Sequence, residues 1–217
     1  MSLDKKQKNK IIRIAGHVGA LIPLALLAYD YYFGLFSPDF IREITLRTGK
    51  AAIVLLVLSL AITPLNTLFG WKVLYPLRRI FGVYAFMYVA LHLTIFVYLD
   101  YGLSWPLIRE AIFEKRYALV GFAAFLILLP LAVTSTRWAM KKMGKKWTTL
   151  HKWVYLAAIL AVLHYILLVK NAYTQPFIFA VILGVLLTLR IGPIKQWVIR
   201  QRRNWGKGKK SRAPMNS

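Results

Sequence analysis

Long apolar runs recur along this sequence, and a chain with so many of them folds most readily in a lipid bilayer. Hydrophobic residues make up 59% of the 217 residues. Runs that reach or approach the roughly 20 residues a helix needs to cross a bilayer occur at about 12–33, 50–65, 80–99, 117–135, 151–169 and 176–190. They lack the strict alternation of membrane-spanning strands. The sequence therefore predicts an all-α integral membrane protein, a six-transmembrane-helix bundle in a single domain over residues 1–217.

The first run is expected to stay in the protein. It has no small-residue cleavage site after a compact apolar core, so it does not resemble a removable signal peptide. No internal repeat is evident in the order of residues. We therefore expect six successive helices with no duplicated unit.

The basic residues indicate how these helices are oriented. Cytoplasmic loops retain lysine and arginine preferentially, and with six spans both termini lie on one side. Most of the 30 basic residues fall on that side, whereas six of the seven acidic residues fall on the other. We expect both termini, and the basic tail at 191–217, to be cytoplasmic.

The formal net charge of +23 could also suggest nucleic-acid binding. Membrane topology and contact of the tail with anionic lipid explain the charge more simply. The segment GKGKKS at 206–211 lacks the spacing of a phosphate-binding loop, and no strand precedes it. We expect a lipid bilayer as a partner and no nucleic acid.

Two histidines, His92 and His164, lie inside the third and fifth apolar runs. An imidazole in hydrocarbon is costly unless it is paired, so it indicates function, although for one histidine alone a hydrogen bond between helices is the simpler explanation. A helical rise of about 1.5 Å per residue places both histidines roughly 20 Å from the inner face. At one depth they can face each other across the bundle. Such a pair is typical of the two axial ligands of a haem iron.

The type of haem follows from the residues that are missing. The sequence contains no cysteine, so thioether attachment is impossible and the haem would be of the b type. Zinc or copper would usually recruit more ligands than two histidines without a nearby thiolate or carboxylate. Iron held between two imidazoles suits electron transfer, because no position is left open for oxygen.

Two further histidines, His151 and His17, lie nearer the cytoplasmic side. The step from His151 to His164 is about 20 Å along a helix, which suits two stacked cofactors, but the two side chains would point about 140° apart. On the third helix, the position on the same face as His92 is Arg78, which stays protonated and cannot bind iron. His151 and His17 are therefore candidate ligands, and the number of haems is one or two.

Several motifs, taken in order, are similar to those of a known family. They are GHVGALIPL (16–24), RTGKAA (47–52), LAITPL (60–65), LRRIFGVYAF (77–86), ALHLT (90–94), LPLAVTST (129–136) and GKKWTTLHKWVYLAAILAVLHY (144–165). Over essentially its whole length the chain resembles the MsrQ (YedZ) family, the haem-binding membrane subunits of bacterial periplasmic methionine-sulfoxide reductase systems, within the ferric-reductase-like transmembrane superfamily. Related oxidases carry two histidines on the third helix, and Arg78 departs from that pattern.

The resemblance implies a multi-pass cytochrome b of the bacterial inner membrane. Such a subunit passes electrons outward to a periplasmic molybdopterin enzyme, which reduces methionine sulfoxide in oxidised proteins. The resemblance also implies haem b, FMN, and electrons drawn from the quinone pool or from a cytosolic flavin reductase. Arginine and lysine bind phosphate, so Arg78 and Arg79 are candidate flavin or donor contacts, although topology alone also accounts for them.

Other functions remain open at this point. The chain could be another ferric-reductase-like electron carrier, or a small transporter in which histidines relay protons. Such relays usually include buried carboxylates, and Asp30 is the only acid inside the six runs; a purely structural scaffold would bind no cofactor. The longest segment outside the membrane is too short for a dinucleotide-binding domain. Electrons would therefore come from another protein or from a membrane-soluble carrier, and no substrate-reducing site is evident in the chain itself.

Overall fold

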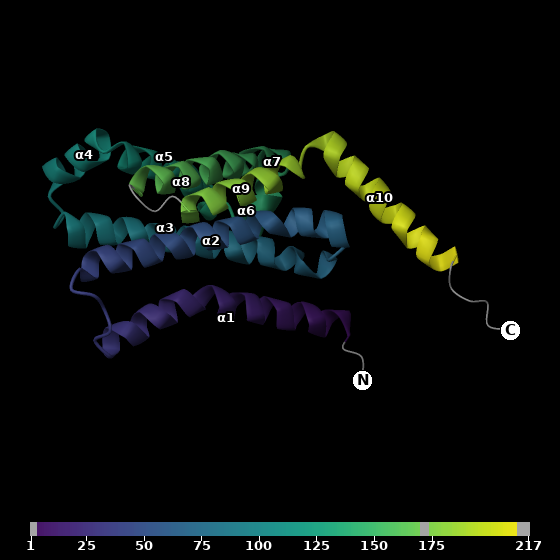
Figure 1. Ribbon diagram of the computed structural model, residues 1–217, viewed down its shortest axis with the longest axis horizontal. Helices are drawn as coiled ribbons and strands as arrows, with labels where there is room; N and C mark the ends of the chain where they lie inside the picture. The colour runs from purple at the N-terminus through teal and green to yellow at the C-terminus, as the bar shows by residue number, and fades with distance from the viewer. Residues whose placement is uncertain (1–3, 170–173, 212–217) are drawn as a thin grey trace.

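The computed structural model describes residues 4–169 and 174–211, and all regular structure within these ranges is helical (Figure 1). The α-helices are α1 (Lys5–Tyr32), α2 (Phe40–Phe69), α3 (Tyr75–Ile95), α4 (Trp105–Glu114), α5 (Arg116–Val133), α6 (Arg137–Met143), α7 (Lys145–Leu150), α8 (Val154–Leu168), α9 (Thr174–Thr188) and α10 (Gly192–Ser211). Short 3₁₀ turns, η1 (Lys72–Leu74) and η3 (His151–Trp153), and one π-helical turn, η2 (Phe96–Asp100), adjoin them. The all-α expectation is confirmed.

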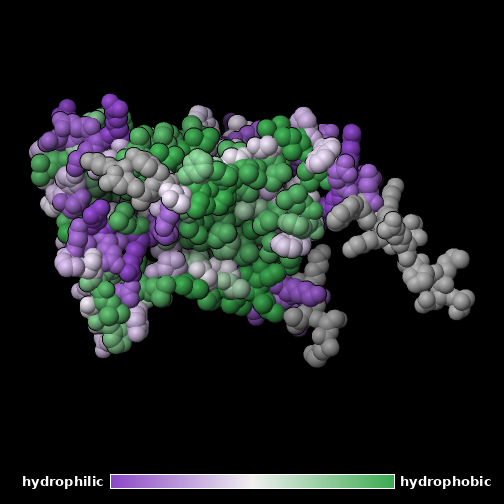
Figure 2. Space-filling model, in the orientation of Figure 1, coloured by the Kyte–Doolittle hydropathy of each residue, from purple (hydrophilic) through white to green (hydrophobic). Residues whose placement is uncertain are grey.

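Five helical stretches are long and apolar enough to cross a membrane: Lys6–Tyr32, Phe40–Phe69, Lys72–Asp100, Arg116–Val133 and Lys145–Leu168. A sixth crossing is available if Thr174–Thr188 and Gly192–Asn204, which bend by 78° at a short break, form one span. Figure 2 shows the result as a wide apolar belt between two polar ends. The chain is a multi-pass membrane protein.

Helix α2 extends well beyond its apolar run at both ends. The second run was expected from about residue 50, but α2 already begins at Phe40, after Asp39, whose side chain accepts a hydrogen bond from the Arg42 amide. Its first turns are polar, which is why hydropathy does not include them. Arg47 in this part of α2 forms ion pairs with Glu43 and with Asp30 of α1.

Three regions expected as connections are helical. Between the third and fourth runs, α4 buries Ile108, Ala111 and Ile112 on one face. The loop after α5 contains α6 and α7. The basic tail forms α10, and Arg202 of this helix donates hydrogen bonds to the carbonyl oxygens of Asn66 and Thr67 at the end of α2, at 2.8 and 2.9 Å. The first part of α1 and α10 lie at the same end of the bundle (Figure 1).

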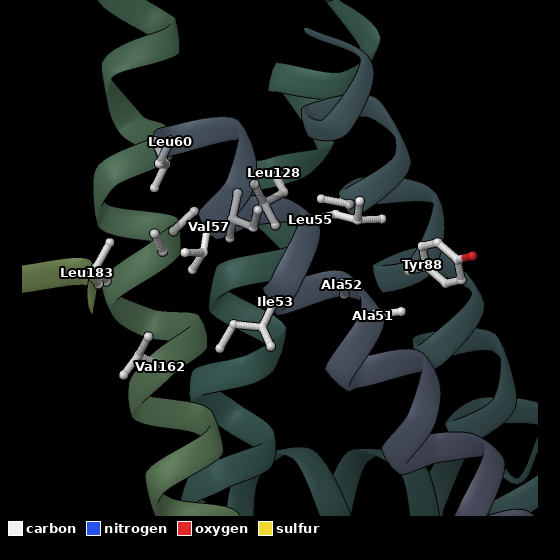
Figure 3. Packing of buried hydrophobic residues seen from close by; sticks show 14 of the residues in the cluster. Ala51, Ala52, Ile53, Leu55, Val57, Leu60, Tyr88, Leu128, Val162 and Leu183 are labelled. Carbon is white, nitrogen blue, oxygen red and sulfur yellow. The ribbon is translucent and has the colours of Figure 1, made fainter. Parts of the chain in front are cut away.

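Helix α2 forms the centre of the bundle. In its most apolar stretch 56% of the residues are buried, against 17% in each of the other four candidate spans. Small side chains allow the neighbours to pack closely: Ala85 of α3 and Ala157 of α8 are fully buried in the same cluster as Ala52 of α2. Figure 3 shows how α2 contributes to this core with leucine, isoleucine, valine and alanine. The pair α2–α3 thus meets the pair α5–α8 over a continuous apolar interface.

Helix α1 lies on the other side of the α2–α3 pair (Figure 1). Its attachment depends on Tyr88, a fully buried residue of α3. The Tyr88 hydroxyl donates to the carbonyl oxygen of Ala20 at 2.9 Å and accepts from the amide of Leu24 at 3.0 Å. These are the two groups that would pair in an uninterrupted helix, and they flank Pro23. A side chain of α3 is therefore inserted into the hydrogen-bond ladder of α1.

Candidate haem site

His92 of α3 and His164 of α8 face each other inside the bundle. Their ring centroids are 6.2 Å apart, and the ring planes are nearly perpendicular, at 86°. The structure thus brings together the two histidines that the sequence singles out. They come from different helix pairs, so the site lies at the interface between α2–α3 and α5–α8.

Each of these rings is oriented by a hydrogen bond to a backbone carbonyl. Nδ1 of His92 lies 2.9 Å from the carbonyl oxygen of Thr45 in α2, and Nδ1 of His164 lies 2.7 Å from that of Tyr117 in α5. A carbonyl oxygen only accepts, so Nδ1 carries the proton in both rings. In a neutral ring, Nε2 then has a free lone pair. This arrangement is typical of histidines that bind metals.

Two glycines make room for the rings. A β-carbon on Gly121 would lie 2.7 Å from Nδ1 of His164, and one on Gly49 would lie 3.2 Å from Nδ1 of His92. The first distance is too short for any side chain to be added without moving the histidine. Each glycine also lies four residues after the carbonyl that orients its histidine, on the same helix face. We call each set of carbonyl, glycine and histidine a latch.

The two latches repeat along the chain, which corrects the expectation that no internal repeat exists. Thr45, Gly49 and His92 form the first, and Tyr117, Gly121 and His164 form the second 72 residues later at every position. In each case 47 residues separate the carbonyl from the histidine. The sequence signal was GKAA at 49–52 and GFAA at 121–124. That signal is too short to stand out without knowing which helices pair.

The geometry fits a haem iron between the two rings. A metal–imidazole bond is about 2 Å long and the ring centroid lies about 1 Å further, so two rings bound to opposite faces of one metal would have centroids roughly 6 Å apart. The observed 6.2 Å agrees. Among the described residues there is no cluster of three or more histidines, cysteines and acids. The donor set therefore fits a metal whose remaining ligands belong to a macrocycle.

His151 has a different hydrogen-bonding pattern. Its Nε2 lies 3.0 Å from Oγ1 of Thr134, whose own proton is directed to the carbonyl oxygen of Pro130 at 2.6 Å. Nε2 of His151 is therefore the donor, and in a neutral ring only Nδ1 remains free. Trp147 stacks on the ring at 3.9 Å. His92 and His164 present Nε2, so His151 is not prepared for iron in the same way.

His17 lies against α3 rather than beside His151. Its Nδ1 is 3.2 Å from the Tyr84 hydroxyl, and the two rings pack edge to face. Helix α1 packs against α3, α2 and η1, whereas α8 packs against α5, α9 and α2. The structure thus gives the third and fourth histidines separate partners.

Arg78, Arg79 and His151 line one inner cavity of about 180 Å³ between the two helix pairs. Most of its wall is apolar and comes from α2, α3, α5 and α8. The carbonyl oxygen of Arg78 accepts a hydrogen bond from Oγ of Ser59 at 2.7 Å, which fixes this turn of α3 against α2. The candidate donor contacts therefore do lie together, on the side of the two latches that the charge distribution predicts to be cytoplasmic.

Comparison with known proteins identifies the family. The ferric reductase like transmembrane component family matches residues 48–162, a range that contains both latch glycines and ends two residues before His164. A haem-binding subunit MsrQ of the protein-methionine-sulfoxide reductase from Rhodospirillum rubrum is 41% identical over 200 residues, which cover 92% of this chain and 94% of that protein. The chain belongs to the MsrQ family.

Other relatives carry the same name. The MsrQ of Xanthomonas campestris pv. campestris is 40% identical over 185 residues, covering 82% of this chain and 85% of the relative. That of Xanthomonas axonopodis pv. citri is 41% identical over 181 residues, covering 81% and 83%. No solved structure matches the chain significantly. Membership places this multi-pass MsrQ-family chain in the bacterial inner membrane.

Proposed function

We propose that this chain is the b-type cytochrome subunit of a methionine-sulfoxide reductase system and holds one haem between His92 and His164. The observation that carries the proposal is the pair of latches, which fix the proton of each ring on Nδ1, leave each Nε2 free to bind a metal and place the ring centroids 6.2 Å apart. The names of the relatives, haem-binding subunits, support it. When bound, the haem supplies a one-electron centre. The chain supplies the ligands, fixes their tautomers and surrounds them with apolar helices that exclude water.

The electron path is proposed to run from the cytoplasmic side outward. The inner cavity with Arg78 and Arg79 is the candidate contact for the donor, either a quinone or a cytosolic flavin reductase, and for FMN. The acceptor is proposed to be a periplasmic, molybdopterin-containing reductase subunit. It would dock on the outer end of the bundle, where acidic residues lie just before α2, in its first turn, at the end of η2 and in α4: Asp39, Glu43, Asp100, Glu110 and Glu114.

The absorption spectrum of the purified chain tests the central claim. We expect a reducible b-type spectrum, and we expect His92→Ala and His164→Ala to lose nearly all haem, because each removes an axial ligand. Added imidazole should restore part of the haem to either variant by filling the space left by the ring. A colourless wild-type preparation would instead favour a transporter or scaffold, and variants that keep the wild-type spectrum would exclude this pair as ligands.

The number of haems is tested by His151→Ala. A single haem between His92 and His164 predicts an unchanged haem-to-protein ratio and an unchanged redox titration. A lower ratio, or the loss of one component of the titration, would show that a second haem is bound near His151.

A further inference from the structure

A second cavity, of about 220 Å³, lies at the end of the bundle where α9 breaks into α10. Its polar lining is almost entirely cationic or hydroxylic: it includes Arg78, Arg190, Lys195, Tyr155 and Thr63. Arg78 separates it from the inner cavity, because this residue lines both. The cavity is therefore adjacent to the candidate donor site and shares α2, α3 and α8 with it, but Arg190 and Lys195 at the break between α9 and α10 line this cavity alone.

Arg190 is held in place without a counter-ion. Its Nη1 donates to the Tyr155 hydroxyl at 2.7 Å and its Nη2 to the carbonyl oxygen of Leu60 at 2.5 Å, while its Nε is buried and unpaired. Oγ1 of Thr63 is a second buried polar atom without a partner. Two hydrogen-bonding groups at one cavity thus remain available.

None of the described residues that line this cavity is acidic. Both ion pairs found in the described residues involve Arg47, which belongs to the α1–α2 region with the acidic groups. Six of the seven acids lie on that opposite side of the membrane, and the seventh, Asp4, caps the start of α1. A buried charge without a partner is strongly unfavourable. The counter-ion has to come from outside the chain.

We propose that this cavity binds a phosphate group. A guanidinium with a free N–H, an ammonium and a hydroxyl are the donors that phosphate oxygens accept from, and the N-terminus of the 20-residue α10 adds positive potential beside Lys195. Pockets for whole drug-sized ligands are about 300–1,000 Å³, so this smaller cavity accommodates the charged group alone. The phosphate belongs either to an anionic phospholipid or to a soluble phosphate compound, and the site does not depend on the haem proposal.

Binding is tested with the full chain, purified in detergent and stripped of lipid. Inorganic phosphate is one probe and short-chain phosphatidylglycerol the other, with the unfolding temperature as the readout and chloride added to equal ionic strength. We expect at least one probe to raise the unfolding temperature saturably. Lys195→Gln should weaken the apparent affinity about tenfold, the size expected for a lost hydrogen bond between charged groups.

Lys141→Gln is the matched control, because it removes the same charge from an exposed lysine on the same side of the membrane. Lys195 is also exposed, so its substitution should leave the fold intact. A second variant, Arg190→Lys, keeps the positive charge and tests whether the planar guanidinium group itself is required. Stabilisation by phosphate alone identifies a soluble ligand, and stabilisation by the lipid alone identifies a headgroup. Stabilisation by neither, or equal weakening by Lys141→Gln, would overturn the proposal.

Discussion

A carbonyl oxygen and a missing β-carbon orient each of the two central histidines. Neither a carbonyl oxygen nor a glycine identifies a metal site by itself. Together they orient the histidine: the hydrogen bond fixes the proton on Nδ1, and the glycine leaves space for the ring in one position. His92 and His164 therefore use the same nitrogen, Nδ1, for the hydrogen bond and leave the same nitrogen, Nε2, free. His151 lacks this arrangement, because its Nε2 is hydrogen-bonded to Oγ1 of Thr134.

The glycines provide a graded test of the latches. Gly121→Ala should lower haem affinity by about 10–100-fold, the usual effect of disturbing a group that orients a metal ligand, because its β-carbon would lie 2.7 Å from His164. Gly49→Ala, with a closest approach of 3.2 Å, should have a smaller effect. The haem content that each variant retains after graded dilution measures both affinities.

Gly184→Ala is the control for this pair, because a β-carbon there meets nothing within 4 Å. It should keep the wild-type haem content. If Gly121→Ala retained haem as well as Gly184→Ala does, the close approach of the glycine to His164 would be irrelevant to binding.

The sequence predicts the two histidines better than it predicts the backbone carbonyl groups that orient them. His92 and His164 stand out because a polar ring in an apolar run needs a partner. Thr45 and Tyr117 act through backbone carbonyls, which carry no sequence signal. Which carbonyl a ring reaches depends on how two helices are paired and on their relative height, and neither can be deduced from one helix.

Helix α1 is held by the Asp30–Arg47 ion pair, by the His17–Tyr84 contact and, at its buried face, by the hydroxyl of Tyr88. The Tyr88 hydroxyl bridges Ala20 and Leu24 on either side of Pro23, where α1 cannot form all its own hydrogen bonds. An inserted side chain is a known cause of helix bending. The bend of α1 and the docking of its buried face thus have one origin.

Tyr88→Phe should therefore weaken the attachment of α1. Leaving buried donors and acceptors without partners costs about 1–3 kcal/mol, measured as the free energy of unfolding in mixed micelles. Tyr84→Phe is the matched control: its hydroxyl contacts the exposed His17, so the change should stay within about 0.5 kcal/mol. Equal stability of the two variants would show that α1 does not rely on the bridge.

The existence of the helices was predictable, and their ends were less so. Hydropathy locates the buried part of each span, because that part is uniformly apolar. It misses the polar first turns of α2, where Glu43 and Arg47 pair, and the amphipathic α4, which is apolar on one face only. Neither segment is apolar enough to be recognised as part of the membrane region.

Over the whole molecule, charge and cofactor position together suggest a direction for electron flow. Basic groups dominate the end with Arg78, Arg79 and Arg190, whereas the end with Asp30 and Glu43 holds six of the seven acidic residues beside a similar number of basic ones. By the distribution of positive charge, we expect the first end to be cytoplasmic.

Reversing Arg78 and Arg79 to glutamate should slow reduction of the haem by the donor. Transfer from pre-reduced haem to the periplasmic acceptor should be unchanged, because the substituted residues lie on the opposite side. Stopped-flow spectra of the two half-reactions separate these steps. Correct insertion has to be verified first with a C-terminal tag, because charge reversal can invert topology.

Arg200→Glu, a reversal on the exposed face of α10, is the control for nonspecific charge effects. If the double variant inserted correctly and were reduced at the normal rate, yet failed to pass electrons outward, the proposed direction would be wrong.

The two latches are also separated in time while the chain is being made. Each is complete within its own helix pair, so the first requires nothing from the second. At about 5–20 residues per second, the ribosome adds the intervening 72 residues in roughly 4–14 s. During that interval His92 can already be oriented in the membrane while its counterpart has yet to be synthesised. On the proposed function, a haem can be held by both rings only after the second latch is made, so we expect its capture to be a late event in biogenesis.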